Sequence, residues 1–234
     1  MTSTSENVLP ETAFPQTVCG FLRDLAANNQ RDWFEANRTR YESEWLEPAK
    51  AYVEGIAGWM QTLDPPHKGE AKVNGSIRRI NRDVRFSKDK TPYDPRLHLV
   101  FWTGDHPNRS PGIHIVLHPD RLGLGAGHWA MSPEELARYR KAVCEPSTGQ
   151  KLLNITNDCA QSGYPLGEET LKRVPSGFDV GEDRASLLKR KGLVVRTGET
   201  FIDPETICDQ ATMRVALAQL SAVNRWLVEH VVAG

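Results

Sequence analysis

Residues 97–118 read LHLVFWTGDHPNRSPGIHIVLH, and they predict the centre of the fold. A short apolar run (97–102) is typical of a buried strand, and the alternating pattern IHIVLH (113–118) is typical of a half-buried one. The segment between them (103–112) is dense in Gly, Pro, Asp, Asn and Ser, which favour turns. We therefore expect two antiparallel strands joined by a long loop.

Helical patterns lie on both sides of this hairpin. Apolar residues recur there at intervals of three and four, and Ser132, Pro133 and Glu135 mark the start of a capped helix. The patterns predict helices at residues 17–28, 33–41, 48–60, 132–143, 152–161, 184–189 and 213–231, and further strands at 77–86, 171–174 and 193–196. Strands in the middle indicate an α+β fold with a central, mostly antiparallel sheet and helices grouped at the N- and C-terminal ends.

The length of 234 residues is within the usual range for one domain. We expect a flexible tail (1–13) and a single domain (14–234), in which a helical part (14–66) precedes a β-rich part (72–127) and a mixed α/β part (128–234). The first residues lack the basic and apolar regions of a secretory signal, and no apolar run approaches the roughly 20 residues that span a bilayer. A cytoplasmic protein without a membrane segment is therefore expected.

The cysteines give no sign of a metal or redox site. Cys19, Cys144, Cys159 and Cys208 lie far apart and form no CxxC pair. We expect reduced, buried thiols, and no GxSxG motif offers another nucleophile.

Positive charge is concentrated in one segment although the formal net charge of the chain is −1. Residues 68–90 contain eight Lys and Arg residues against three acids, a local excess of five. A near-neutral chain argues against a nucleic-acid-binding protein, whose domains are typically basic overall. Any anion site must therefore be local.

The segment IRRINRDVRF (77–86) would have two chemically different faces if it formed a strand, because side chains alternate between the faces of a strand. The polar face would contain Arg79, Asn81, Asp83 and Arg85. The other face would place Arg82 and Phe86 toward a core, where Arg82 would need a carboxylate from a neighbouring element. We therefore expect Arg82 to have a structural role.

The turn that follows (87–93) can bring Lys90 and Tyr93 to the same place as the polar face. The preferred hypothesis is a pocket for a small phosphate- or carboxylate-bearing ligand. In that pocket Arg79 and Arg85 would contact the anion, Lys90 would add charge, and Tyr93 would donate a hydrogen bond. Asp83 would orient the arginines or, if the protein is an enzyme, act as a base.

Two other hypotheses explain the same charges. The basic segment could belong to an interaction module that contacts an acidic protein surface or a nucleic-acid backbone. Alternatively, the charges could form an internal salt-bridge network without a ligand. The sequence leaves enzymatic activity and oligomeric state open.

The same residues carry a resemblance to a known family. The pattern Arg79-x-x-Arg82-Asp83-x-Arg85-Phe86-x-x-Asp89-Lys90-x-x-Tyr93 resembles the signature of a bacterial family catalogued as domain of unknown function 2461. The stretches FLRDLAANNQRDWFEANRTRYE (21–42) and LKRVPSGFD (171–179) agree with it, and the resemblance spans residues 14–228. It places Arg82, Phe86 and Asp89 in a structural motif, and it implies a cytoplasmic single-domain protein without an assigned activity.

Other patterns are weaker. His98, His114 and His118 lie on the predicted hairpin and could hold a metal, but no ordered acid completes a ligand set, so we predict partly exposed strand histidines and no metal. Gly123, Gly125 and Gly127 have the spacing GxGxG, which is not that of a dinucleotide fingerprint, so we predict close backbone packing and no cofactor.

Overall fold

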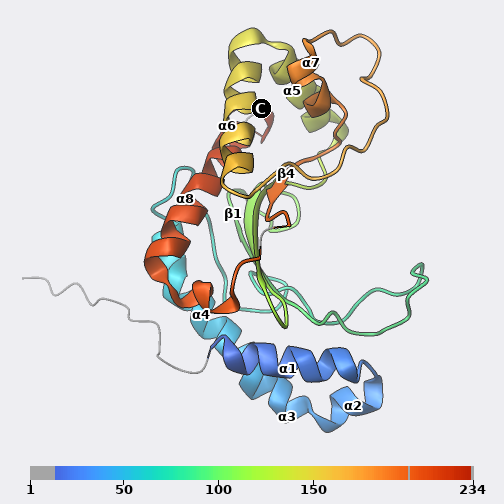
Figure 1. Ribbon diagram of the computed structural model, residues 1–234, viewed down its shortest axis with the longest axis vertical. Coiled ribbons are helices and arrows are strands. Elements are labelled where there is room, and N and C mark those ends of the chain that lie inside the picture. The colour runs from blue at the N-terminus through green and yellow to red at the C-terminus, as the bar shows by residue number, and fades with distance from the viewer. Residues whose placement is uncertain (1–13, 200, 233–234) are drawn as a thin grey trace, which may run out of the picture.

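The computed structural model of the protein describes residues 14–199 and 201–232, so the tail predicted at residues 1–13 lies outside the described residues. Its centre is an antiparallel sheet in the order β1-β2-β3-β4 (Figure 1). The strands are β1 (Leu97–Trp102), β2 (Gly112–Leu117), β3 (Leu122–His128) and β4 (Leu193–Arg196). In the first pair Leu97 lies opposite Leu117 and Trp102 opposite Gly112, so the predicted hairpin is confirmed.

Helices lie before β1 and after β3 along the chain, with β4 between α7 and η2, which confirms the α+β fold (Figure 1). The N-terminal group comprises α1 (Gln16–Ala27), α2 (Arg31–Ala36), α3 (Arg38–Arg40), the π-helical turn η1 (Tyr41–Leu46) and α4 (Glu47–Met60). The C-terminal group comprises α5 (Pro133–Cys144), α6 (Pro146–Gln161), α7 (Glu182–Leu188), the 3-10 turn η2 (Pro204–Cys208), α8 (Gln210–Leu227) and the π-helical turn η3 (Val228–Val232). None of the described helices has the length and apolar character needed to cross a membrane.

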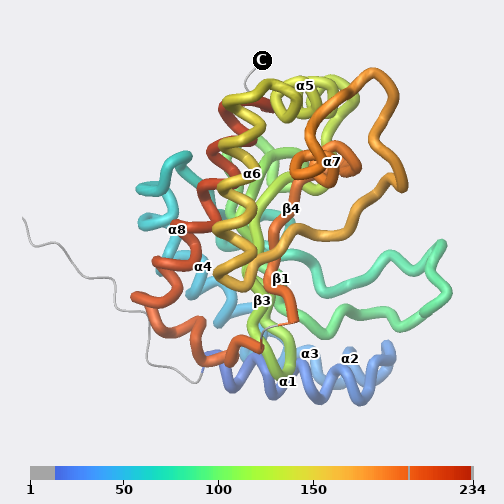
Figure 2. Tube along the Cα trace, turned by 45° about the horizontal axis from the view of Figure 1, so that its top comes forward, coloured from blue at the N-terminus to red at the C-terminus, as the bar shows by residue number. Residues whose placement is uncertain are grey.

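The two faces of the sheet differ. On one face, Ile113, Ile115 and Leu117 are buried and pack with the apolar stripe of α8. On the opposite face His98, His114 and Val116 are only half-buried, whereas Val100 and Trp102 are buried. Two long loops, residues 77–96 and 165–181, project on the side of the sheet away from α8 (Figures 1 and 2).

Glycines allow β3 and β4 to approach closely, as predicted from their spacing. A Cβ atom at Gly125 would lie 2.8 Å from the carbonyl oxygen of Val195. Gly127 has φ +139°, and its Cβ would clash with the carbonyl oxygen of Leu193. Side chains at these positions would therefore separate the two strands.

The strand predicted at residues 77–86 is wrong. The segment makes isolated bridges, from Ile77 to Val73 and to Leu99, and from Asn81 to Tyr93. It folds back on residues 92–99 as an irregular hairpin, because a bend near Val84, where Ser87 N donates to its carbonyl oxygen, ends the extended conformation. Two other short pairings occur at the sheet, between Lys68 and Trp102 and between Leu166 and Val195.

Two smaller predictions also fail. Residues 171–174 form no strand, because the chain there is held by hydrogen bonds from Thr170 N and Leu171 N to a single acceptor, the carbonyl oxygen of Lys189. All four thiols are free, and Cys19 and Cys159 are buried as predicted, but Cys144 is half-buried and Cys208 is exposed. The Cys208 Sγ donates to the carbonyl oxygen of Phe14.

Candidate functional site

The arginine-rich segment forms a long loop, residues 77–96, that we call the arginine loop. It leaves the sheet before β1 and extends beside the N-terminal helices (Figures 1 and 2). Its arms are joined by backbone hydrogen bonds, from Arg82 N to Pro92 O (2.9 Å) and from Asp94 N to Ile80 O (2.8 Å). The loop therefore has a defined shape without being part of the sheet.

One arm of the arginine loop is fixed to the turn between α1 and α2. Asn29 Nδ2 donates to Tyr93 O (2.9 Å), and Tyr93 N donates to Asn29 Oδ1 (3.1 Å). The Tyr93 ring is 4% exposed and stacks on Phe34 with ring centroids 4.2 Å apart, and burial raises the pKa of its phenol. Tyr93 therefore anchors the loop to the helical part.

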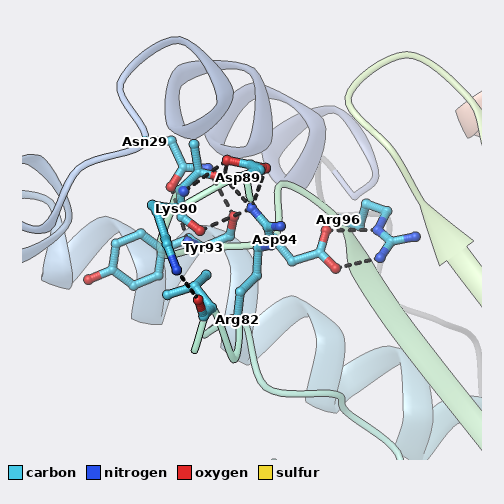
Figure 3. A network of polar contacts seen from close by, with 9 residues as sticks. Asn29, Arg82, Asp89, Lys90, Tyr93, Asp94 and Arg96 are labelled. Carbon is cyan, nitrogen blue, oxygen red and sulfur yellow. Dashed lines mark hydrogen bonds and ion pairs between the residues drawn. The ribbon is translucent and has the colours of Figure 1, made fainter. Parts of the chain in front are cut away.

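The end of the loop is closed by a cluster of polar contacts (Figure 3). Arg82 Nη1 donates to Asp89 Oδ2 (2.6 Å) and to Thr91 O (3.0 Å), and it also contacts the Thr91 hydroxyl. Asp89 Oδ1 accepts hydrogen bonds from Thr91 N and Thr91 Oγ1, both at 2.9 Å. The Thr91 N–H and the Arg82 guanidinium lower the pKa of Asp89 to about 2. Arg82 thus finds its carboxylate within its own loop and not on a neighbouring element.

Two more charged residues also bond within the loop. Lys90 Nζ donates to the carbonyl oxygens of Val84 (2.9 Å) and Arg85 (3.4 Å). Arg85 forms a two-point contact with Asp83, from Nε to Oδ1 (3.0 Å) and from Nη2 to Oδ2 (2.7 Å), which lowers the pKa of Asp83. Asp83 therefore orients one arginine, Arg85, at an exposed position.

The four ligand residues predicted from the sequence do not meet in one cavity. The Tyr93 ring lies against Phe34, the Lys90 ammonium caps backbone carbonyls, and Arg85 pairs with Asp83. A cavity of about 270 Å³ between α4 and α8 and another of about 370 Å³ beside Tyr164 are lined by none of the four. The polar face predicted for Arg79 and Arg85 required a strand, and the loop is bent.

Phe86 lies in solvent, which corrects the prediction that it faces a core. Its side chain is 94% exposed, and the Arg85 guanidinium lies 5.8 Å from the centre of its ring. The bend at Val84 turns this part of the loop away from the apolar layer that a strand would have reached.

Arg79 and Lys88 are also exposed, and within the described residues neither forms an ion pair. We call Arg79, Arg85, Phe86 and Lys88 the basic tip.

Internal ion pairs account for only part of the positive charge in residues 68–90. Lys68, Lys72, Arg82 and Arg85 each contact a carboxylate, on Asp105, Glu70, Asp89 and Asp83 respectively. Arg78 instead donates to neutral groups, the side-chain oxygen of Asn108 and the carbonyl oxygen of Pro107. A salt-bridge network therefore explains half of the eight cations.

The hairpin histidines are brought together in part. His98 Nε2 and His114 Nδ1 are 2.9 Å apart and share a hydrogen bond. His118 lies on the same side, and burial lowers its pKa. Within residues 14–199 and 201–232, no group of three or more His, Cys, Asp or Glu side chains is placed to hold a metal ion.

The family is decided by a match over most of the chain. A family model described as "Conserved hypothetical protein (DUF2461)" matches residues 17–227. The chain belongs to the DUF2461 family. No curated protein is significantly similar to this DUF2461 protein in sequence.

The motif that resembles the DUF2461 signature has a clear structural meaning in this chain. Arg82, Asp89 and Lys90 close the arginine loop, and Tyr93 attaches it to the helices. Sequence reasoning missed Asn29, the partner of Tyr93, because Asn is common in turns for local reasons and gives no sign of a distant partner. It also missed Arg78, whose backbone N–H donates to His98 O (2.9 Å) and so places it beside the histidine pair.

Proposed function

We propose that this DUF2461 protein is a binding protein that recognises an acidic surface of a partner protein through the basic tip. The observation that carries the proposal is the Phe86 side chain, 94% exposed beside the Arg85 guanidinium. Aromatic and Arg side chains are the residue types that contribute most of the binding energy at protein interfaces. The unpaired cations Arg79 and Lys88 would add attraction to an acidic partner.

The shape of the arginine loop favours this function. The contacts of Arg82 with Asp89 and Thr91, and of Lys90 with Val84, hold the loop before any partner arrives. A loop that is already ordered loses less conformational entropy on binding than a flexible one. The internal ion pairs of the loop thus support recognition by the residues that they leave exposed.

A pocket for a small ligand at the same residues is less well supported. Small-molecule sites typically bury about 70–90% of their ligand, whereas Arg85 and Phe86 are exposed. A nucleic-acid partner also fits less well, because the formal net charge of the chain is −1. A small anion remains the second candidate function, at another place: the half-buried guanidinium of Arg78 beside His98 and His114.

Photo-crosslinking from the basic tip tests the proposal. A photoreactive phenylalanine analogue replaces Phe86 in the full chain, and a control chain carries it at Val215, which is 71% exposed on α8. We expect a discrete crosslinked protein from position 86 and not from position 215. Equal products at both positions, or crosslinks from position 86 to nucleic acid only, would overturn the proposal.

The captured protein then allows a quantitative test. Phe86→Ala should weaken its binding by at least about tenfold, as expected for an interface residue of high energy, whereas Val215→Ala should not change it. Because the tip is exposed, its electrostatic contribution should decrease as salt rises. Equal affinity of wild type and Phe86→Ala would contradict a role for the tip. Capture of a second copy of this chain would redirect the proposal to self-association.

A further inference from the structure

The sheet face opposite α8 carries a cluster of imidazole and guanidinium groups that lies outside the basic tip. His98 of β1 and His114 of β2 are diagonal neighbours, because Val100 lies opposite His114 and Val116 opposite His98. Their ring centroids are 5.1 Å apart, and the hydrogen bond between Nε2 of His98 and Nδ1 of His114 is 2.9 Å long. One ring must donate and the other accept, so the bonded pair is neutral when each ring carries one proton.

The half-buried Arg78 lies beside this pair, and no carboxylate of the described residues forms an ion pair with it. Its Nη1 and Nη2 contact the side chain of Asn108 and the carbonyl oxygen of Pro107, which leaves Nε outside these bonds. Partial burial lowers the pKa of Arg78, which means that the protein makes its charged form less stable. A guanidinium in this position gains most from an anion that offers two oxygens to its fork.

The charged groups that face the histidine pair are cationic. His98 faces three groups: Arg78 in the arginine loop, Arg96 just before β1, and His118 just after β2. His114 faces Arg78. Burial and these neighbours lower the pKa of His98 to about 3, and burial and Arg78 lower that of His114 to about 4. Two carboxylates act on His118, those of Asp120 and Asp94. The carboxylate of Asp94 is held by Arg96 through two hydrogen bonds of 2.7 and 2.6 Å (Figure 3).

Two glycines keep the neighbouring part of the face free of side chains. Gly125 of β3 lies opposite His114 of β2 and opposite Arg196 of β4. The exposed side chain of Arg196 is therefore on the same face as His114, two strands away. Gly123 lies opposite Val116, and a Cβ atom there would be 3.7 Å from its nearest neighbour. An anion beside His114 would therefore have Arg78 on one side and Arg196 on the other.

We propose that Arg78, His98 and His114 form a binding site for the phosphate group of a small molecule. Arg78 supplies the permanent positive charge, and the histidine pair takes up a proton when the anion binds, so that both rings donate hydrogen bonds. Affinity should therefore rise as pH falls, because the bound anion raises the histidine pKa values and binding becomes coupled to protonation. The site is separate from the basic tip and does not depend on it.

Sulfate is the first probe, because its charge stays constant over the pH range in which the histidines titrate. We expect sulfate to shift the imidazole ¹⁵N resonances of His98 and His114 in NMR spectra of the full chain and to raise the pH at which they titrate. Inorganic phosphate should act in the same way, and malonate tests whether carboxylates are accepted. Absence of a shift with sulfate and phosphate, or shifts with malonate only, would overturn the proposal. A response to zinc without a response to sulfate would also overturn it.

Variants separate a binding site from a general charge effect. Arg78→Gln should weaken sulfate binding by about tenfold or more, and His114→Gln should remove its dependence on pH. Arg214→Gln is the matched control, because it removes the same charge from α8, where the guanidinium lies 5.6 Å from the ring centre of Trp59. An equal loss of sulfate affinity in Arg78→Gln and Arg214→Gln would show that sulfate binding depends only on the net charge of the protein. Thermal unfolding of each variant checks that the comparison is between folded proteins.

Discussion

The side-chain amide of Asn29 pairs with both backbone polar groups of Tyr93, across 64 positions of sequence. A primary amide offers the same donor and acceptor as a peptide group. The Asn29 side chain therefore pairs with Tyr93 in the way that the backbone of a neighbouring strand would. This contact and the stacking of Tyr93 on Phe34 join the arginine loop to the helical part of the chain. The arginine loop therefore depends on a residue far from it in sequence.

Replacement of Asn29 should loosen the arginine loop. Asn29→Ala leaves the half-buried N–H and C=O of Tyr93 without their partner, which costs about 1–3 kcal/mol of unfolding free energy. Urea unfolding measures the loss, and hydrogen exchange of the Tyr93 amide shows whether it is local. Asn28→Ala is the control, because among the described residues the Asn28 side chain bonds to Asp24 O of its own helix and to no other group. A larger loss in the control than in Asn29→Ala would contradict the anchoring role.

Acid should open the end of the loop only at low pH. The folded pKa of Asp89 is about 2, below its ordinary value of 3.8, so its contribution is complete above about pH 4 and is lost as pH falls toward 2. An NMR titration of the Asp89 carboxyl carbon, with the Thr91 amide as reporter, measures both events. In Asp89→Ala, which removes the acceptor oxygens of residue 89, the Thr91 amide should lose its protection already at neutral pH. A titration midpoint of the Asp89 carboxyl group near pH 4 in the wild type would contradict its hydrogen bonds with Arg82 and Thr91.

A buried histidine should make the whole protein less stable in mild acid. His67 is fully buried, its Nε2 accepts a hydrogen bond from Asn224 Nδ2 (2.8 Å), and burial lowers its pKa to about 4. Because the unfolded chain binds the proton near pH 6.5, stability should fall between about pH 6.5 and pH 4 by up to about 3 kcal/mol.

Urea unfolding at several pH values measures this fall. His98 and His114 contribute in the same direction, so the informative comparison is with His67→Gln. That variant should be less stable than the wild type near neutral pH and should show a shallower decrease toward acid. An equal slope in both proteins would exclude His67 as a cause.

Two glycine substitutions should have opposite effects. Gly127→Ala should destabilise the protein by more than about 1 kcal/mol, because φ is +139° and the added Cβ would clash with Leu193 O. Gly20→Ala should stabilise it by about 0.5–1 kcal/mol, because Gly20 lies inside α1 and its Cβ would meet no atom within 4 Å. Thermal unfolding of both variants gives the two signs, and a stabilising Gly127→Ala would refute the close approach of β3 and β4.

Alternation predicted β2 correctly and residues 77–86 wrongly for a physical reason. In β2, Ile113, Ile115 and Leu117 are buried because the strand has α8 on one side. In the arginine loop, charged and apolar residues also alternate, but the charges pair with one another, Arg85 with Asp83 and Arg82 with Asp89. Local ion pairs can thus imitate the pattern of a strand.

Contacts between distant segments could not be predicted from one sequence. Asn29 and Tyr93 are far apart, and neither residue type points to the other. His98 and His114 could be placed on neighbouring strands, but their hydrogen bond depends on the register that puts Val100 opposite His114. The residues that provide charge were therefore predictable, whereas the groups that they face were not.

The short pairings at the two outer strands of the sheet limit how a partner can bind. Ile77 and Lys68 occupy the free side of β1, and Leu166 occupies that of β4. An open edge strand offers its backbone to almost any extended peptide, with little regard to sequence. Here the chain itself takes both places, so a partner must be recognised by side chains. Single substitutions should therefore change which partner is chosen.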